Sequence, residues 1–318
     1  MRNADADTKT TAPQTVSRLQ STDVKVMARV CVVGSLNMDL SLRVDALPRP
    51  GETVLASSLT HAPGGKGGNQ AVAAARAGAR VQFVGAVGDD PAAEQLRAHL
   101  LNNGVGLDAT AGTPGPSGTA IVVVDTGAEN TIVVAPGANG RLTLDNAAAL
   151  SVIAGCDVLL TQLEIPVRAA VTAAQQARSA GAIVIVNASP AGHKQNLLAD
   201  LAAAADVVIA NEAEADAWPW RPTHLVTTLG ARGARYVGAD GDFVVPAPAV
   251  AAVDTAGAGD VFAGVLAGSW PRNPGSPAQR LRALQRACAA GALATLVPGA
   301  GNCAPDAEAI DAALESPA

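Results

Sequence analysis

From about residue 157 onward the chain alternates short apolar runs with longer helical segments, and this alternation limits the folds open to it. The runs are rich in Val and Ile and read as strands buried on both faces. Buried strands separated by helices predict a mainly parallel sheet with helices on both faces, an α/β fold. We expect its strands at 29–34, 81–85, 157–161, 183–187, 207–210, 224–228 and 234–237. We expect helices at 70–77, from 90 onward, and at 167–180, 196–204, 261–267, 277–295 and 305–314.

Two segments, near 38–62 and 114–137, do not follow this pattern. Each contains two partly alternating strands around a turn, which predicts half-exposed antiparallel pairs. Because two-stranded pieces are not stable alone, we expect them to join as one small sheet. That sheet would lie over the carboxyl edge of the parallel strands, where open α/β folds bind ligands.

The remaining organisation is simple. Residues 1–28 are polar, without hydrophobic periodicity or the apolar core of a signal peptide, so we expect a disordered tail before one domain at 29–316. Met27, directly before the first strand, is an alternative start of the native chain.

Composition excludes several functions. The 22 basic and 28 acidic residues give a net charge of −6, and aromatic residues are 2% of the chain, so we expect no nucleic-acid partner. No apolar run reaches the roughly 18 residues of a membrane span. The 4 cysteines form no CxxC pair and indicate a reduced, cytoplasmic protein. The 4 scattered histidines give no zinc motif.

The run DTAGAGD, residues 254–260, leads into an apolar helix and carries the strongest chemical signal. Gly257 and Gly259 allow backbone N–H groups to converge at a helix N-terminus and form an anion hole. Asp260 in the first turn can accept a hydroxyl proton while those groups hold a transferring phosphoryl. A bare GxGD would be an ordinary helix cap, but the full run favours function.

A second glycine-rich run, GGKGGN at 64–69, opens an Ala-rich helix and allows the backbone close to a ligand. Asn69 offers a donor and an acceptor to vicinal hydroxyls. Asn37 and Asp39, two residues apart in an extended segment, point to one side and suit a polyol. A flexible loop and an Asx turn are the respective structural alternatives.

Two further motifs follow predicted strands. Asn211 and Glu214 share one face of a helical turn and can hold a hydrated Mg²⁺ on a nucleotide phosphate, although a capping box explains the same spacing. Residues 228–233 (TLGARG) can wrap a nucleotide, or simply form a hairpin turn into the next strand.

Together these motifs resemble the ribokinase-like (PfkB) family of carbohydrate kinases, over roughly residues 30–314. The runs VVGSLNMDL, PRPGETV, GGKGGNQAVAAARAGA, QLEIP, NEAEA and TLGARG match in order and spacing. The resemblance implies a Rossmann-like α/β domain with a β-sheet lid. It also implies ATP-dependent phosphorylation of a sugar, with ribose at O5 as the expected acceptor.

The resemblance assigns roles residue by residue. Asp260 would be the base, and Gly257, Ala258 and Gly259 would form the anion hole. The sugar site would comprise Asn37, Asp39, Gly65, Lys66, Gly67, Asn69, Glu164 and Asp260. The nucleotide would meet Asn211, Glu214, Thr228, Leu229, Gly230, Ala231, Arg232, Gly233, Gly259 and Cys288, with Mg²⁺ held by Glu214 through water. An activating K⁺ would be bound by Asp254, Ala256, Ala294, Val297, Gly299 and Cys303.

The sequence departs from the family at two of these positions. Cys303 stands where Ser is usual, and a thiol is a poor ligand for a hard cation. Cys288 stands where a polar residue commonly contacts adenine, and it reads more simply as a small buried hydrophobe.

Other functions stay open at this point. Fructokinase, deoxyribokinase or another sugar kinase of the family is the main alternative. A nucleoside kinase is disfavoured by the aromatic-poor lid, and a non-catalytic sugar-binding regulator by the intact Asp260 and glycine turn. Exposed strand edges and an apolar face of the lid predict a homodimer.

Overall fold

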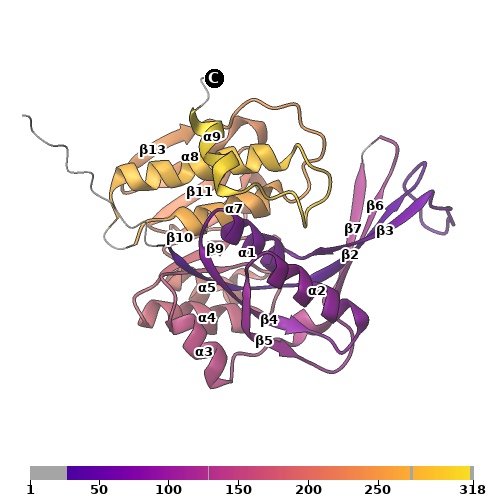
Figure 1. Ribbon diagram of the computed structural model, residues 1–318, viewed down its shortest axis with the longest axis horizontal. Helices are drawn as coiled ribbons and strands as arrows, with labels where there is room; N and C mark the ends of the chain where they lie inside the picture. The colour runs from indigo at the N-terminus through magenta and orange to yellow at the C-terminus, as the bar shows by residue number, and fades with distance from the viewer. Residues whose placement is uncertain (1–26, 128, 273–274, 316–318) are drawn as a thin grey trace, which may run out of the picture.

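The computed structural model describes residues 27–127, 129–272 and 275–315 and is organised around a nine-stranded sheet (Figure 1). The strands, in spatial order, are β13 (Gly241–Val245), β12 (Ala234–Gly238), β11 (His224–Thr228), β10 (Val207–Asn211), β9 (Ile183–Asn187), β8 (Val158–Thr161), β1 (Arg29–Val33), β4 (Arg80–Val87) and β5 (Gly106–Gly112). Neighbours from β11 to β5 are parallel, and β12 and β13 add an antiparallel edge. The predicted mainly parallel sheet is confirmed.

Helices cover both faces of the sheet, because successive side chains of each buried strand point to opposite sides. Val30 and Val32 of β1 pack in one core, and Cys31 and Val33 pack in the other. The first core is covered by α1 (Lys66–Arg76), α2 (Pro91–Asn102), α7 (Ala258–Ser269), α8 (Pro277–Ala294) and α9 (Ala307–Glu315). The second is covered by α3 (Ala147–Ala154), α4 (Val167–Ser179) and α5 (Gln195–Ala204).

A separate four-stranded sheet projects from this body at the right of Figure 1. We call it the lid; its strands, in spatial order, are β3 (Ser58–Gly64), β2 (Asn37–Arg43), β6 (Gly118–Val124) and β7 (Asn130–Ala135). The two segments that left the α/β pattern therefore join as expected, through parallel pairing of β2 with β6. Every residue of the edge strand β7 is exposed.

Several predicted boundaries were wrong. The second strand of the 38–62 segment runs past residue 62, over Ser58–Gly64, and the glycine-opened helix expected at 70–77 begins earlier, at Lys66. The sequence analysis also missed β5, β13 and α3. Strands β5 and β13 contain Gly and Asp, which are rare in strands. Helix α3 is a short apolar run without the polar positions that reveal an amphipathic helix. Residues 1–26, which hold most of the predicted tail, lie outside the described residues.

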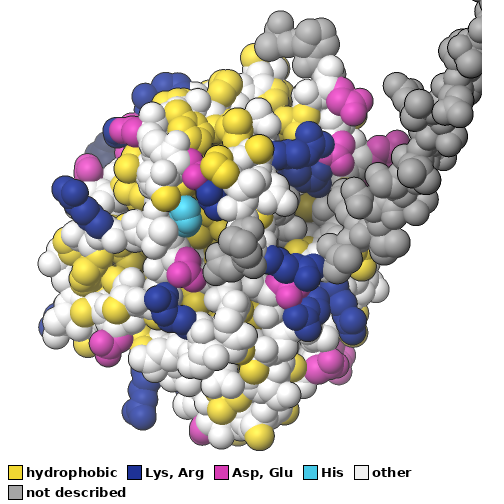
Figure 2. Space-filling view, turned by 90° about the vertical axis from the view of Figure 1, so that its left-hand side faces the viewer, with side chains coloured by type: hydrophobic (Ala, Val, Ile, Leu, Met, Phe, Trp, Pro, Cys, Tyr) yellow, Lys and Arg dark blue, Asp and Glu magenta, His cyan; other side chains and the backbone are white. Residues whose placement is uncertain are grey.

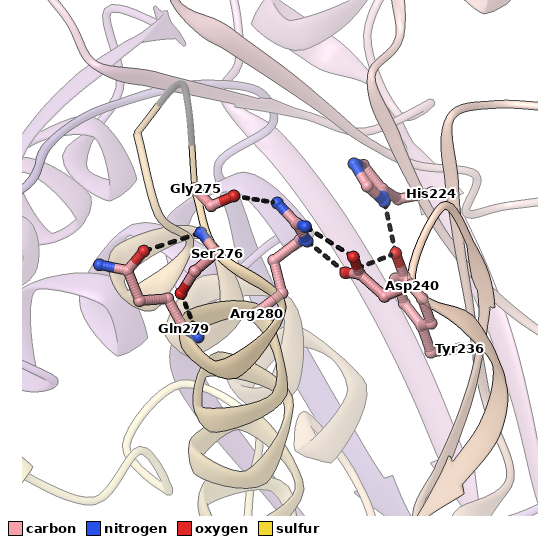
Figure 3. A network of polar contacts seen from close by, with 7 residues as sticks. All are labelled: His224, Tyr236, Asp240, Gly275, Ser276, Gln279 and Arg280. Atoms are coloured by element: carbon pink, nitrogen blue, oxygen red, sulfur yellow. Dashed lines mark hydrogen bonds and ion pairs between the residues drawn. The ribbon is translucent and has the colours of Figure 1, made fainter.

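A half-buried polar network connects α8 to the edge of the large sheet (Figure 3). Arg280 of α8 pairs with Asp240 in the β12–β13 turn, and its Nη1 donates to the Gly275 carbonyl at 2.8 Å. The Tyr236 hydroxyl bridges Asp240 and His224, at 3.2 and 2.7 Å. These contacts hold α8, whose far end leads to the loop that supports the site described below.

The surface agrees with the charge balance. On the face turned away from the lid, basic and acidic side chains are interspersed and form no continuous basic area (Figure 2). Among the described helices, none has the length and apolar character that a membrane span requires.

Candidate active site

The predicted base lies at the N-terminus of α7. Its N-cap, Gly257, has a left-handed φ of 78°, and a Cβ there would lie 2.7 Å from the Cα of Ala300, so both conformation and space require glycine. A Cβ on Gly259 would meet nothing within 4 Å, so this residue borders open space. The first-turn amides and the positive end of the helix therefore face a region open to a ligand, beside Asp260.

That region is a cavity of about 200 Å³ at the carboxyl ends of β9, β10 and β11. Its lining residues are Lys66, Asn187, Ser189, Ile209, Ala210, Asn211, Glu214, Thr228, Gly257, Gly259 and Asp260. Seven of these were predicted from sequence motifs far apart in the chain; Asn187, Ser189, Ile209 and Ala210 were not. A larger cavity of about 490 Å³ beside the start of α4 shares none of these residues.

The carboxylate of Asp260 is held by two consecutive residues of α1. Asn69 Nδ2 donates to Oδ2 at 3.2 Å, and Gln70 Nε2 donates to Oδ1 at 2.9 Å. Each oxygen accepts one hydrogen bond, which fixes the plane of the carboxylate and leaves further lone pairs for a substrate proton. Contact between α1 and α7 thus places the two glycine-rich motifs together.

Of the other predicted sugar-site residues, Lys66 shares the cavity lining with Asp260, whereas Asn37, Asp39 and Glu164 lie outside that lining. Asn37 is buried, and its Oδ1 accepts from Asn139 Nδ2 at 2.8 Å. Asp39 packs so tightly on Gly64 that a Cβ there would lie 2.0 Å from its Oδ2. Glu164 Oε2 accepts from the Ser35 hydroxyl at 2.6 Å and from the Lys66 amide at 3.3 Å.

The backbone of the second glycine run also requires small residues. Gly65 has a φ of 87°, and a Cβ on Gly67 would lie 2.6 Å from the Ser35 amide nitrogen. The loop after β1 and the start of α1 therefore approach too closely for any side chain between them. Lys66, at the start of α1, lines the cavity, and Asn69 reaches Asp260 from the same turn.

The site concentrates acidic groups around one ammonium. Burial raises the pKa of Asp39 to about 7, and the charges of Glu164 and Asp260 add to this effect. Burial alone would lower the pKa of Lys66, but Asp260, Glu164 and Glu214 outweigh it, so that pKa is raised. Lys66 therefore stays a cation and can meet a phosphate, while Asp39 titrates near neutral pH.

The residues predicted to bind the nucleotide form the capping box and the hairpin turn that were the alternatives to a nucleotide site. Asn211 and Glu214 form a capping box at the start of α6 (Glu212–Asp216), with N–H···O distances of 2.8 and 2.9 Å. Both still line the cavity. Residues 228–233 form the hairpin turn between β11 and β12, in which Gly230 and Gly233 have positive φ.

Six members of the predicted nucleotide set lie outside the cavity lining: Leu229, Gly230, Ala231, Arg232, Gly233 and Cys288. Cys288 is buried in the core with its thiol 3.6 Å from the Val245 carbonyl, and burial raises its pKa to about 12. It is the small buried hydrophobe that the sequence also allowed. Arg232 forms a bidentate, exposed ion pair with Glu212, at 2.9 and 3.0 Å.

The residues predicted to bind the cation lie mainly in two loops, 254–256 and 299–303, that contact each other next to the N-terminus of α7. Asp254 accepts from the Ala256 amide at 2.9 Å and from the Gly299 amide at 2.8 Å. The Cys303 thiol lies 3.3 Å from the Ala300 carbonyl and 3.8 Å from the Ala256 carbonyl. The Val297 amide donates to the Ala294 carbonyl at 3.2 Å. The described residues include no cluster of three His, Cys, Asp or Glu side chains fit for a metal.

Sequence reasoning missed the residues that support the site. Ser35, Gln70, Asn139, Gln162 and Asn187 are all buried polar residues that bond to predicted site residues or to each other. Gln70 follows Asn69 directly, but neighbouring residues on a helix point about 100° apart, so their shared target could not be read from spacing. The available signal for Asn187 and Gln162 was a polar side chain at the carboxyl end of an apolar strand: Asn187 is the last residue of β9, and Gln162 directly follows β8.

Comparison with known proteins defines the class. Residues 27–307 match the pfkB family carbohydrate kinases. The ribokinase of Bacillus subtilis (strain 168) is 39% identical over 248 residues, which cover 74% of this chain and 83% of the relative. The deoxyribokinase of Salmonella typhi is 30% identical over 261 residues, covering 75% and 84%. The structure of Arabidopsis thaliana ribokinase complexed with ribose and ATP has a TM-score of 0.81 at 27% identity, covering 92% of this chain and all of that one.

The chain therefore belongs to the pfkB family of carbohydrate kinases, and it is an enzyme that phosphorylates a sugar. Within the family, the resemblance to ribokinases that the motifs indicated is confirmed by both the sequence and the fold comparisons. The Rossmann-like domain with a β-sheet lid is confirmed as well.

Proposed function

We propose that the protein transfers the γ-phosphoryl group of ATP to O5 of D-ribose, with Asp260 as the base. The observation that carries this proposal is the placement of Asp260 beside the open first turn of α7, in one cavity with Lys66. Ribose O5 attacks the γ-phosphorus, and the bond from that phosphorus to the β–γ bridging oxygen breaks to release ADP. Asp260 takes the O5 proton, and the amides of the 257–259 turn stabilise the charge on the phosphoryl oxygens.

Ribose is the acceptor that the relatives favour, and the polar wall of Asn37, Asp39 and Glu164 suits its hydroxyls. Deoxyribose is the second candidate, because a deoxyribokinase is among the relatives. Closure of the lid over the cavity would exclude water and limit hydrolysis of ATP.

Mg²⁺ would enter with ATP. Glu214 fits this ion, because it lines the cavity and only its Oε2 is engaged by the Asn211 amide in the described structure. The ion would neutralise phosphate charge during transfer.

A monovalent cation such as K⁺ would sit where the 254–256 and 299–303 loops meet. Backbone carbonyls there, including that of Ala256, are oxygen ligands that suit a hard cation, and the thiol of Cys303 is not. We infer that carbonyls hold K⁺ without the Cys303 side chain. Bound there, the ion would stabilise the turn that forms the anion hole.

The lid supports assembly of a homodimer. Ile132, Val133 and Val134 of the edge strand β7 are exposed at 56%, 61% and 42%, and exposed Ile121 of β6 lies opposite Val133. Leu59 is exposed as well, on the other edge strand β3. Apolar side chains on a long strand edge favour pairing with a second copy. The four free, buried cysteines support a reducing compartment, and we infer the cytoplasm.

Release of ADP, measured by a coupled assay with MgATP, tests this function. We expect strong dependence on ribose, compared with deoxyribose, fructose, adenosine and no sugar, and stimulation by K⁺ over Na⁺. Asp260→Ala should lose most turnover and retain ribose binding by calorimetry, because its role is confined to the transition state. Turnover of Asp260→Ala near the wild-type rate would refute the assignment of the base.

A further inference from the structure

The described structure holds Asp260 through a residue that cannot touch any substrate. Gln70 has 0% exposure, yet its amide group lies directly against the carboxylate. Its neighbour Asn69, also bonded to Asp260, belongs to the predicted sugar site, but Gln70 faces the interior of the domain.

The hydrogen bonds of Gln70 have a single possible direction. A carboxylate only accepts, so the NH₂ group of Gln70 must face Asp260. The second proton of that group goes to Asn187 Oδ1, at 3.0 Å. The Gln70 oxygen then faces away from the carboxylate and accepts from Gln162 Nε2, at 2.7 Å. Both protons and the oxygen are used, so the amide cannot rotate without breaking all three bonds.

One end of this amide chain is held by packing and the other by a hydrogen bond; the Gln162 Oε1 itself has no hydrogen-bond partner among the described residues. Gln162 also has 0% exposure, and its Oε1 lies so close to Gly34 that a Cβ there would approach it to 2.0 Å. Asn187 at the end of β9 donates to the Ile209 carbonyl of β10, at 3.2 Å, and lines the same cavity as Asp260. The chain therefore connects the sheet, α1 and α7.

We propose that Gln70 is a positioning residue for Asp260, fixed by Gln162 and tied through Asn187 to the opposite wall of the cavity. Gln70 turns the unused lone pairs of the Asp260 carboxylate toward the cavity. It also keeps the carboxylate at a fixed position relative to the side of the cavity where the phosphates would lie. The proposal rests on the proposed role of Asp260 as the base. Gln70 touches neither substrate nor phosphate itself.

The test compares two Gln→Met variants that each lose one amide-to-aspartate hydrogen bond of 2.9 Å. Gln70→Met removes the bond to Asp260 together with those to Asn187 and Gln162, and Gln82→Met removes the bond from Gln82 on β4 to Asp108, outside the cavity lining. We expect Gln70→Met to lower kcat about 10- to 100-fold, part of the full effect of a general base, with KM for ribose and MgATP nearly unchanged. Gln82→Met should keep the wild-type kcat.

A double variant separates positioning from general damage. In the Asp260→Asn background the base is absent, so adding Gln70→Met should change the residual rate by less than about twofold. An equal loss in both backgrounds, or wild-type kcat in Gln70→Met, would overturn the proposal. Gln70→Glu provides an independent readout, because two carboxyl groups in contact share a proton and should move the acidic limb of the kcat–pH profile to higher pH.

Milder substitution keeps the test decisive if Gln70→Met does not fold. Gln162→Met leaves Gln70 in place and frees its oxygen, so kcat should fall less than in Gln70→Met, again without a change in KM. If Gln162→Met behaves like Gln82→Met and the pH profile of Gln70→Glu is unchanged, Gln70 has no positioning role. Lack of ribose-dependent turnover in the wild type would instead refute the proposed function, and the role of Gln70 with it.

Discussion

Asp39→Asn should make the protein more stable at neutral and alkaline pH. Asp39 has a pKa of about 7 in the folded protein because it is buried beside Glu164 and Asp260, whereas its ordinary value is 3.8. An acid with a raised pKa binds its proton more tightly when folded, so its contribution to stability is complete below about pH 4 and is lost as the pH rises through about 7. The asparagine side chain has no charge and no such loss.

The magnitude follows from these two values. A tenfold change in proton affinity is about 1.4 kcal/mol, so the full difference between 3.8 and about 7 corresponds to at most about 4 kcal/mol. Because part of the loss occurs below the practical range, the stability difference between Asp39→Asn and wild type should grow by about 2 kcal/mol between about pH 5.5 and 8.5.

Urea unfolding of both proteins across this pH range measures the effect. Asp200→Asn, at an exposed position of α5, is the matched control. The control should follow the wild type at every pH. If the difference in unfolding free energy between Asp39→Asn and wild type does not change with pH, Asp39 is ionised throughout. Burial and the charges of Glu164 and Asp260 would then not raise its pKa. Loss of ribose affinity in the stabilised variant is expected if the ionised group accepts hydrogen bonds from the sugar.

Three further substitutions test the frame of the site. Gly257→Ala should destabilise the protein by about 2 kcal/mol and lower kcat, because its Cβ meets Ala300 and its φ of 78° is left-handed; unchanged melting and turnover would contradict this. Arg280→Met leaves the half-buried Asp240 without its ion-pair partner and should cost about 2 kcal/mol in urea unfolding; an unchanged urea midpoint would contradict this. Burial lowers the pKa of His224, so as the pH falls below about 6.5 the unfolded chain is protonated first and the folded state loses stability. His224→Gln should reduce this loss of stability. An identical pH dependence of unfolding in the variant and the wild type would contradict the role of His224.

Local chemistry made part of the site readable. Gly257 and Asp260 lie in one short run, and the turn, helix N-terminus and carboxylate follow from that run alone. Asn211 and Glu214 likewise form their capping box from local spacing. The hydrogen bonds from Asn69 and Gln70 to Asp260 cross about 190 residues and depend on how α1 packs against α7, which no local pattern contains.

The sequence by itself determined the strand–helix alternation, the antiparallel strand pairs of the lid and the turns of the glycine motifs, because each depends on neighbouring residues. The tertiary structure decided that β2 pairs in parallel with β6, that one cavity collects Lys66, Glu214 and Asp260, and that Cys288 lies in the core. It also created the raised pKa of Asp39, since burial and the charges of Glu164 and Asp260 act only when distant segments meet. Packing and electrostatics act through space, so these properties appear only once the chain has folded.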